Sequence, residues 1–168
     1  MAEGARTKVP FRRRREGRTD YRRRLRLLRS GEARAVVRKT LNQTQIQVVA
    51  YDERGDRIVA SALSGELKAF GWTGGTGNVP AAYLAGLLAG RRAAKNGVTS
   101  AVLDLGVQRP TGGGRLFAAA KGLLDGGVAI PHGEDVIPSD ERLRGAHLGD
   151  ARAKEIAAVK AKLEAEAP

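Results

Sequence analysis

The first thirty residues hold most of the positive charge of this chain, and that limits what they can fold into. The 168-residue sequence has a formal net charge of +12. Residues 1–30 contain twelve Lys or Arg and three acids, a net charge of +9, whereas the remaining residues contain 18 basic and 15 acidic groups. A segment with so much like charge and so few apolar residues cannot bury a core of its own. We therefore predict a basic arm, extended by itself up to residue 18, on a nearly neutral folded body.

Arginine accounts for eleven of the twelve basic residues in the arm. A guanidinium can donate to two phosphate oxygens at once and can stack on a base, which an ammonium cannot do. A disordered tail or a localisation signal is the alternative explanation of such a charge run. The density of arginine favours nucleic acid as the partner. The arm residues that we expect to contact RNA are Arg6, Lys8, Phe11, Arg12, Arg13, Arg14, Arg15, Arg18, Tyr21, Arg22, Arg23, Arg26 and Arg29.

Length and composition indicate one domain with appendages. We divide the chain into a basic RNA-binding arm and helix (1–30), an α/β body (31–148) and a helical tail (149–168). Hydrophobic residues make up 42% of the sequence, which is enough for a core, and cysteine is absent. No apolar run approaches the ~20 residues of a membrane span, and the charged start lacks the apolar core of a secretory signal. We expect a soluble, cytoplasmic protein with no membrane partner.

The end of the arm has the pattern of a helix. Thr19 is the expected N-cap and Gly31 the expected stop. Tyr21, Leu25 and Leu28 fall at i, i+4 and i+7, so they share one face that we expect to pack on the body. The neighbouring face, which we expect to meet RNA, consists of Arg22, Arg26 and Arg29.

The next segments have the composition of β-strands. Residues 34–40, 44–51 and 56–63 are short runs rich in Val, Ile and Thr, and a glycine-ended turn at 52–55 separates the last two. Such runs joined by short turns predict an antiparallel meander of three strands. Residues 64–70 are expected to form a short helix.

Helices and further strands alternate after a glycine-rich loop at residues 71–77. Asn78 is the expected cap of a helix, 101–107 is an apolar run typical of a central strand, Arg115 starts a second helix, and 128–130 can supply a last short strand. The order β-β-β-α-β-α-β predicts an α/β fold with a mixed sheet, in which the antiparallel meander is followed by αβαβ. A last helix over 151–166 is expected as a surface or protruding tail.

Enzymatic alternatives find little support in the sequence. The glycine-rich loop lacks the lysine and the spacing of a phosphate-binding loop, and the order strand, Gly-x-Gly-x-x-Gly, helix does not occur. A metal-dependent nuclease would need several carboxylates at strand ends, and the acids here are dispersed. His132 and His147 are too few for a zinc site without cysteine. We expect no catalytic residues, no metal and no cofactor.

Several stretches, in order along the chain, resemble one known family. They are 8–21 (KVPFRRRREGRTDY), Gly71-Trp72, 77–84 (GNVPAAYL), 101–104 (AVLD), Phe117 with Lys121-Gly122, 130–132 (IPH) and 141–147 (ERLRGAH). These motifs are similar to those of the archaeal-type large-subunit ribosomal protein eighteen, the 5S rRNA-binding family. The resemblance runs from residue 6 to about residue 148, and the tail after Gly149 matches no pattern of the family.

The resemblance implies an α/β body and an arm bound to 5S rRNA in the central protuberance of the large subunit. It also implies contacts with the large-subunit rRNA and with ribosomal protein number five, the other 5S-binding protein. Phosphate contacts carry little sequence information, so discrimination needs a shaped surface on the body. The body residues that we expect to contact RNA are Arg38, Lys39, Asn42, Gln43, Gln45, Gln47, Trp72, Asn78 and Arg115.

The resulting prediction is a structural ribosomal protein that binds 5S rRNA and has no catalytic activity. A general nucleic-acid packaging protein is one alternative, because the arm alone would allow it. An RNA-processing enzyme is the other, although the dispersed carboxylates and histidines oppose it.

Overall fold

A four-stranded mixed sheet lies at the centre of the fold, which is described by a computed structural model for residue 4 and residues 8–165. The meander consists of β1 (Ala33–Lys39), β2 (Thr44–Ala50) and β3 (Arg57–Leu63), all antiparallel. Strand β4 (Ala101–Asp104) pairs parallel with β1, so the strand order is β3-β2-β1-β4. The predicted α/β class and the three-strand meander are confirmed.

Alternation along the strands separates a core face from an open face of the sheet. Ile46 and Val48 of β2 are fully buried, whereas Gln45 is exposed and Gln47 half-buried on the opposite side. Side chains of a strand alternate between the two faces, so Gln45 and Gln47 mark the open face. Their partners on β1 are Arg38 and Val36.

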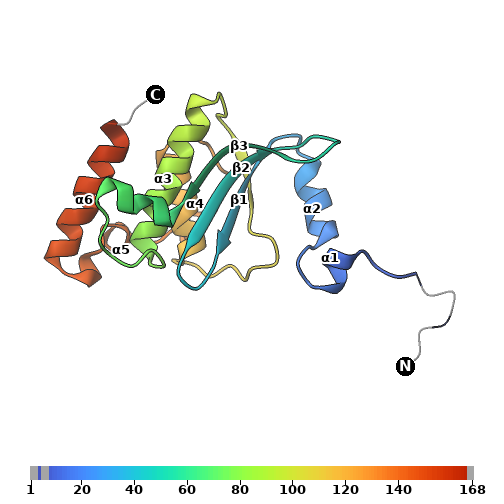
Figure 1. Ribbon diagram of the computed structural model, residues 1–168, viewed down its shortest axis with the longest axis horizontal. Helices are drawn as coiled ribbons and strands as arrows, with labels where there is room; N and C mark the ends of the chain where they lie inside the picture. The colour runs from blue at the N-terminus through green and yellow to red at the C-terminus, as the bar shows by residue number, and fades with distance from the viewer. Residues whose placement is uncertain (1–3, 5–7, 166–168) are drawn as a thin grey trace.

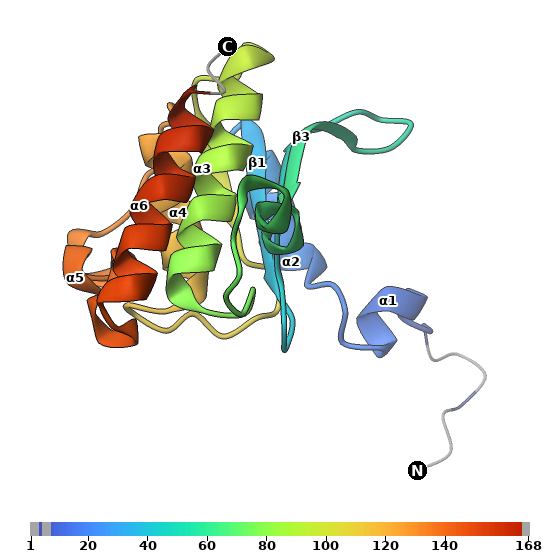
Figure 2. The same ribbon diagram turned by 60° about the vertical axis from the view of Figure 1, so that its left-hand side comes forward.

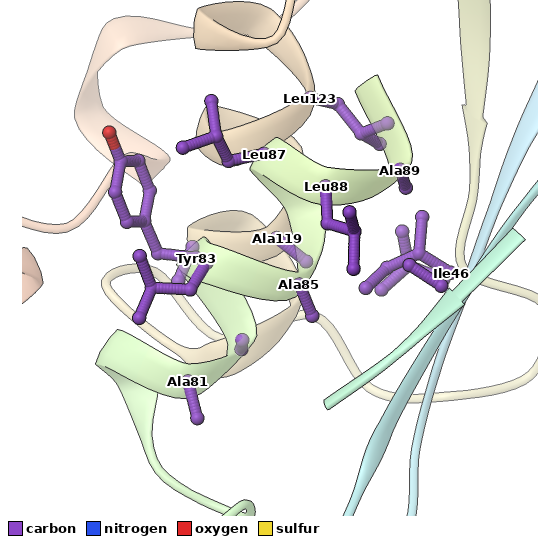
Figure 3. Close-up of a cluster of buried hydrophobic side chains, with 14 of the residues drawn as sticks. Ile46, Ala81, Tyr83, Ala85, Leu87, Leu88, Ala89, Ala119 and Leu123 are labelled. Atoms are coloured by element: carbon purple, nitrogen blue, oxygen red, sulfur yellow. The ribbon is translucent and has the colours of Figure 1, made fainter. Parts of the chain in front are cut away.

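Helices α3 (Val79–Lys95) and α4 (Arg115–Asp125) cover the core face (Figure 1). Asn78 caps α3 as predicted, because its side chain accepts a hydrogen bond of 2.8 Å from the N–H of Ala81. Figure 3 shows Leu88 of α3 between that helix and the sheet, on the side of Ile46, with Tyr83 directed away from the sheet. These side chains belong to one continuous core.

Glycines bring α3 and α4 into backbone contact. A Cβ atom on Gly122 of α4 would lie 2.1 Å from the carbonyl oxygen of Tyr83, and one on Gly86 of α3 would lie 2.2 Å from that of Ala119. No side chain fits at such distances, so the spacing of the two helices depends on these glycines.

Shorter helices and the C-terminal helix complete the body. The expected helix at 64–70 is the 3₁₀ helix η1 (Ser64–Phe70). The remaining elements are η2 (Glu134–Val136), α5 (Asp140–Leu143), η3 (Ala146–Leu148) and α6 (Asp150–Ala165). Figures 1 and 2 place α6 beside α3, on the side away from the sheet. Ile156, Val159 and Leu163 are buried there, so α6 is a packed surface helix and does not protrude.

Two expectations about the second half of the sheet are wrong. Strand β4 lies at the edge of the sheet and ends at Asp104, where the chain turns so that the N–H of Gly106 donates to the Asp104 carboxylate at 2.8 Å. Leu103 and Leu105 pack against the core, which explains the apolar run although β4 has a neighbouring strand, β1, on one side only. Within the described residues, segment 128–130 contributes a single bridge, from Ala129 to Ser100.

The arm lies on the open side of the sheet, opposite α3 and α4 (Figures 1 and 2). It contains α1 (Arg12–Arg15) and α2 (Tyr21–Leu28). None of the described helices has a stretch long and apolar enough to cross a lipid bilayer. The division at residues 30 and 148 stays a prediction.

Candidate nucleic-acid interface

The arm forms a single helical turn, α1, where an extended segment was expected. The rings of Phe11 and Tyr21 lie 5.4 Å apart and tilted by 54°, which connects the start of α1 to α2. The Glu16 carboxylate lies 3.5 Å from Nε of Arg12 and 3.1 Å from Nε of Arg18. These contacts offset the repulsion between arginines, so the prediction of an extended chain is wrong for residues 12–15.

Asp20, and not Thr19, caps the arm helix α2. Its carboxylate accepts hydrogen bonds from the N–H groups of Arg22 (3.0 Å) and Arg23 (3.1 Å). The backbone bond from Arg23 is the main reason that the pKa of Asp20 lies below its ordinary value. Thr19 instead accepts a 2.9 Å hydrogen bond from Nε of Arg13, which joins α1 to the start of α2.

Two arginines of α2 bond the helix to the body. Nη2 of Arg24 donates to both carboxylate oxygens of Asp56 at 2.9 Å, and Nη1 of Arg23 donates to the carbonyl of Gly106. Leu25 is 55% exposed. The prediction that Leu25 packs on the body is therefore wrong, whereas Tyr21 and Leu28 of the same predicted face are half-buried. The side of the helix that carries Arg23 and Arg24 meets the sheet.

The attachment point continues into a buried ladder of charges on the open face of the sheet. Arg34 of β1 is 3% exposed and donates to Asp104 at 2.9 Å and to Asp56. Arg38 donates to the other carboxylate oxygen of Asp104 at 3.0 Å. The charges thus alternate in sign between α2, the sheet and β4, in the order Arg24, Asp56, Arg34, Asp104 and Arg38.

Both carboxyl groups of the ladder stay ionised at neutral pH. Burial opposes the charge of Asp104, but Arg38, the Gly106 N–H and Arg34 outweigh it and lower the pKa of this group. Burial also opposes the charge of Asp56, and hydrogen bonds from Arg24 and Arg34 lower its pKa in the same way. Hydrogen bonds to an ionised carboxylate favour that form.

A cleft of about 300 Å³ lies between the arm and the open face of the sheet. Leu27 of α2 and Val36, Val49 and Ile58 of the sheet supply its apolar walls. Its charged walls are Arg13, Arg18, Arg23, Arg24, Arg34 and Arg38, with Asp20, Asp56 and Asp104. The cleft has more cations than anions, so its field favours an anionic ligand.

Most cations of the arm are exposed. Arg22 and Arg26 of α2 and Arg29 at its C-terminal cap are exposed, as the helical pattern predicts. Lys8, Phe11, Arg12, Arg13, Arg14, Arg15 and Arg18 are exposed as well. Arg6 lies outside the described residues. We call the exposed cations Arg12, Arg14, Arg15, Arg22, Arg26 and Arg29 the outer arginine surface.

A second group of the expected residues meets at the end of the sheet where β1 turns into β2. Thr76 of the glycine-rich loop donates its hydroxyl to the carbonyl of Asn42 at 2.7 Å. Nη1 of Arg115 lies 3.4 Å from the carbonyl of Leu41 and donates to it. Asn42 and Gln43 are exposed and Leu41 is 88% exposed. The fold thus joins the β1–β2 turn, the loop and the start of α4, which we call the turn surface.

Other residues expected at an RNA interface have structural roles. Trp72 is 2% exposed and its Nε1 donates to the carbonyl of Gly75 at 3.3 Å, so its ring belongs to the core and cannot stack on a base. The side-chain oxygen of Asn78 accepts the hydrogen bond that caps α3. Arg38 is engaged by Asp104, and Gln47 is half-buried in the wall of the cleft. Gln45 is exposed on the open face, whereas Lys39 is half-buried at the end of β1 and is in register with the buried Thr44.

Four residues that organise the interface were missing from the predicted set: Arg24, Arg34, Asp56 and Asp104. A signal for one of them, Arg34, is present in the sequence. Arg34 and Arg38 alternate with the apolar residues Ala35 and Val37, which places both arginines on the face opposite the core. Arg34 and its partner Asp104 are 70 positions apart in the chain, so no local sequence pattern predicts that they pair.

Within the part of the chain that the structure describes, no three His, Asp or Glu side chains gather as metal ligands would. The chemistry available at the interface is charge-assisted hydrogen bonding and stacking by guanidinium groups. An exposed arginine surface attached to a small α/β body is typical of proteins that bind nucleic acid.

Comparison with known proteins supports a more specific assignment. Residues 5–99 and 93–133 match the family described as ribosomal large subunit proteins 60S L5 and 50S L18. Large ribosomal subunit protein uL18 of Natronomonas pharaonis is 53% identical over 150 residues, which is 89% of this chain and 82% of that protein. The proteins of the same name from Methanococcoides burtonii and Methanococcus maripaludis are each 54% identical. These two matches cover 89% and 88% of this chain, and 87% and 77% of the relatives. The chain belongs to this family of ribosomal large-subunit proteins.

Proposed function

We propose that this protein is a structural component of the large ribosomal subunit in the cytoplasm, and that it binds 5S rRNA and anchors it in the central protuberance. The ribosomal role follows from its family, whose members named above are ribosomal structural proteins and not enzymes. The proposed partners are 5S rRNA, the large-subunit rRNA and ribosomal protein number five.

The observation that carries the RNA part of the proposal is the outer arginine surface. Its six side chains are exposed, and Arg22, Arg26 and Arg29 are held at helical spacing by a capped helix that is itself fixed to the sheet. Guanidinium groups in such an array can bond successive phosphates of an RNA strand. The helix gives the array an orientation that a disordered tail would lack.

The two surfaces have different tasks in this proposal. The outer arginine surface contacts phosphates and supplies most of the affinity, which falls as salt rises. The turn surface, with Lys39 and Gln45 beside it, offers amides, carbonyls and a guanidinium within one rigid group. Groups of this kind can read base edges and 2′-hydroxyls of single-stranded or irregular RNA, so this surface supplies discrimination.

Crosslinking in cells tests the proposal. The chain is expressed in its native host, irradiated, purified under denaturing conditions, and the attached RNA and the attached peptides are both sequenced. We expect 5S rRNA to be enriched over tRNA relative to their abundances, with crosslinks on peptides that contain residues 12–29. RNA recovered simply in proportion to abundance would support a general packaging protein and would contradict the proposal.

A further inference from the structure

We propose that the C-terminal helix α6 is a brace that fixes the glycine-rich loop (residues 71–77) in the conformation that contacts RNA. This inference rests on the proposed function, because it concerns how the turn surface is held. It assigns a role to α6, which lies beyond the residues that match the family description, 5–133. The residues that we assign as positioning residues are Arg152 and Glu155.

The brace consists of side chains of α6 that bond the loop at its start. The carboxylate of Glu155 accepts a hydrogen bond from the backbone N–H of Thr73. Arg152 donates to the Thr73 hydroxyl at 2.7 Å and also pairs with Glu155. One turn of α6 thereby holds both the backbone and the side chain of a single loop residue. Lys162 extends the contact, because its Nζ donates to the carbonyl of Phe70 at 3.0 Å.

The far end of the same loop is part of the turn surface. Thr76 donates to the carbonyl of Asn42, and a Cβ on Gly77 would lie only 2.8 Å from the carbonyl oxygen of Leu41. The loop is therefore fixed at Thr73 by α6 and at residues 76–77 by the β1–β2 turn. Between these points Gly75 is exposed. A loop held at both ends has little conformational entropy left to lose when RNA binds it.

The bracing contacts are separate from the packing of α6. Ile156, Val159 and Leu163 are buried and attach the helix to the body. Glu155 and Arg152 lie on the flank of the helix, partly exposed, and their bonds go to the loop. The buried face of α6 accounts for its attachment to the body, whereas the bonds of Glu155 and Arg152 act on the loop. The loop contacts thus indicate a task beyond core formation.

The neighbouring tryptophan provides a direct readout of loop order. Trp72 is the single tryptophan of the chain, is 2% exposed, and lies next to Thr73. Its Nε1 bonds the carbonyl of Gly75 inside the same loop. Loosening the loop would open a path from solvent to the indole, so acrylamide quenching of its fluorescence reports on the brace in the free protein.

The test compares Glu155→Ala with Glu164→Ala in the full-length chain. Glu164 is an exposed carboxylate on the same helix that pairs with Lys160 at 3.9 Å, so its removal costs the same charge without touching the loop. We expect Glu155→Ala to raise the quenching of Trp72 and to weaken 5S rRNA binding about three- to tenfold, the equivalent of one lost hydrogen bond. Glu164→Ala should change neither quantity, and both variants should keep the wild-type melting temperature within a few degrees. Glu155→Gln keeps an acceptor for the Thr73 N–H, so it should restore part of the binding.

The outcomes separate this inference from the proposed function. Unchanged quenching in Glu155→Ala would overturn the brace, whatever the RNA measurement gives. Increased quenching with wild-type affinity would also overturn it, since loosening the loop would then have no effect on RNA binding. A wild-type chain that binds tRNA as well as 5S rRNA would contradict the proposed function itself. A large fall in the melting temperature of Glu155→Ala would show that the ion pair serves stability, and would likewise overturn the positioning role.

Discussion

Nη2 of Arg24, in the arm helix α2, donates 2.9 Å hydrogen bonds to both carboxylate oxygens of Asp56, which precedes β3. This pair joins the arm to the sheet, and through Asp56 it is continuous with the buried Arg34 and Asp104. The arm is consequently oriented by charge. Its remaining arginines, on the outer side of α2, stay exposed.

Breaking this pair should loosen α2 without unfolding the body. The Arg24 side chain is 33% exposed, and pairs of this kind contribute about 0.5–1 kcal/mol. We therefore expect Arg24→Gln to lower the hydrogen-exchange protection of amides in residues 21–28 by about two- to fivefold, with little change in melting temperature. Arg26→Gln, which removes an exposed arginine of the same helix, is the control and should leave protection unchanged. Equal loss of protection in both variants would show that Asp56 does not hold the helix.

The buried ladder should make stability depend on pH. Removing the charge of Asp104 leaves Arg34 and Arg38 without their shared partner, so Asp104→Asn should reduce the free energy of unfolding by about 2–4 kcal/mol at pH 7. The pKa of Asp104 is lowered in the folded state, so this stabilisation is complete above its ordinary pKa of about 4 and is lost as pH falls through the folded-state value.

Urea unfolding from pH 7 to pH 3 measures this effect. The difference between wild type and Asp104→Asn should be constant down to about pH 4 and should narrow below it. Glu53→Gln, in the exposed turn between β2 and β3, serves as the control and should follow wild type throughout. A difference that stays constant down to pH 3 would mean that the charge of Asp104 is not what stabilises the fold.

The contact between α3 and α4 should not tolerate a side chain at Gly122. An added Cβ would meet the Tyr83 carbonyl oxygen at 2.1 Å, and both atoms belong to rigid helices. We expect Gly122→Ala to cost about 3 kcal/mol of unfolding free energy, despite the higher helix propensity of alanine. Gly133→Ala, where the described residues place no heavy atom within 4 Å of the new Cβ, should stay within about 0.5 kcal/mol of wild type. Thermal denaturation of both variants and of wild type measures these differences in unfolding free energy.

The outer arginine surface should control affinity and its salt dependence. Changing Arg22, Arg26 and Arg29 to Gln removes three cations that we propose to contact phosphates, so the slope of log K against log salt should become shallower by roughly 2–3 from an expected wild-type value of roughly −4 to −5. The melting temperature should be nearly unchanged because all three side chains are exposed. The control changes Arg142, Arg144 and Lys154 to Gln, which removes the same charge from exposed positions in α5, directly after α5, and in α6. If both triple variants lose affinity equally, net charge and not the arm determines binding.

The sequence predicted most of the body because its signals there are local. Ile46 and Val48 alternate with Gln45 and Gln47, and Asn78 precedes an apolar helical pattern, so the strand and the cap could be predicted. The edge position of β4 could not be predicted, because an apolar run fits any strand whose side chains are covered by other elements. Leu103 and Leu105 are covered by the core and not by strands on both sides. Trp72 shows the same ambiguity, because an indole next to a glycine-rich loop can serve a core or a ligand.

The arm was predicted less well, because what orients it is distant in the sequence. Leu25 and Leu27 lie on different faces of α2, and each face also carries other apolar or basic residues. The sequence of α2 alone therefore does not show which face packs on the body. The hydrogen bonds to Gly106 and Asp56 hold the face that carries Arg23 and Arg24 against the body. One consequence is that Leu25→Ala, which a buried face would make costly, should change stability by less than about 1 kcal/mol.

Competition binding tests the central claim most directly. Labelled 5S rRNA bound to the full-length protein at physiological salt is challenged with unlabelled 5S rRNA, tRNA and duplex DNA. The proposed function predicts that 5S rRNA displaces the label at about its own Kd, and that tRNA and DNA require concentrations at least ~100-fold higher, as specific binding exceeds non-specific binding. Displacement by tRNA or DNA at the same concentration as 5S rRNA would contradict the claim that this protein recognises 5S rRNA.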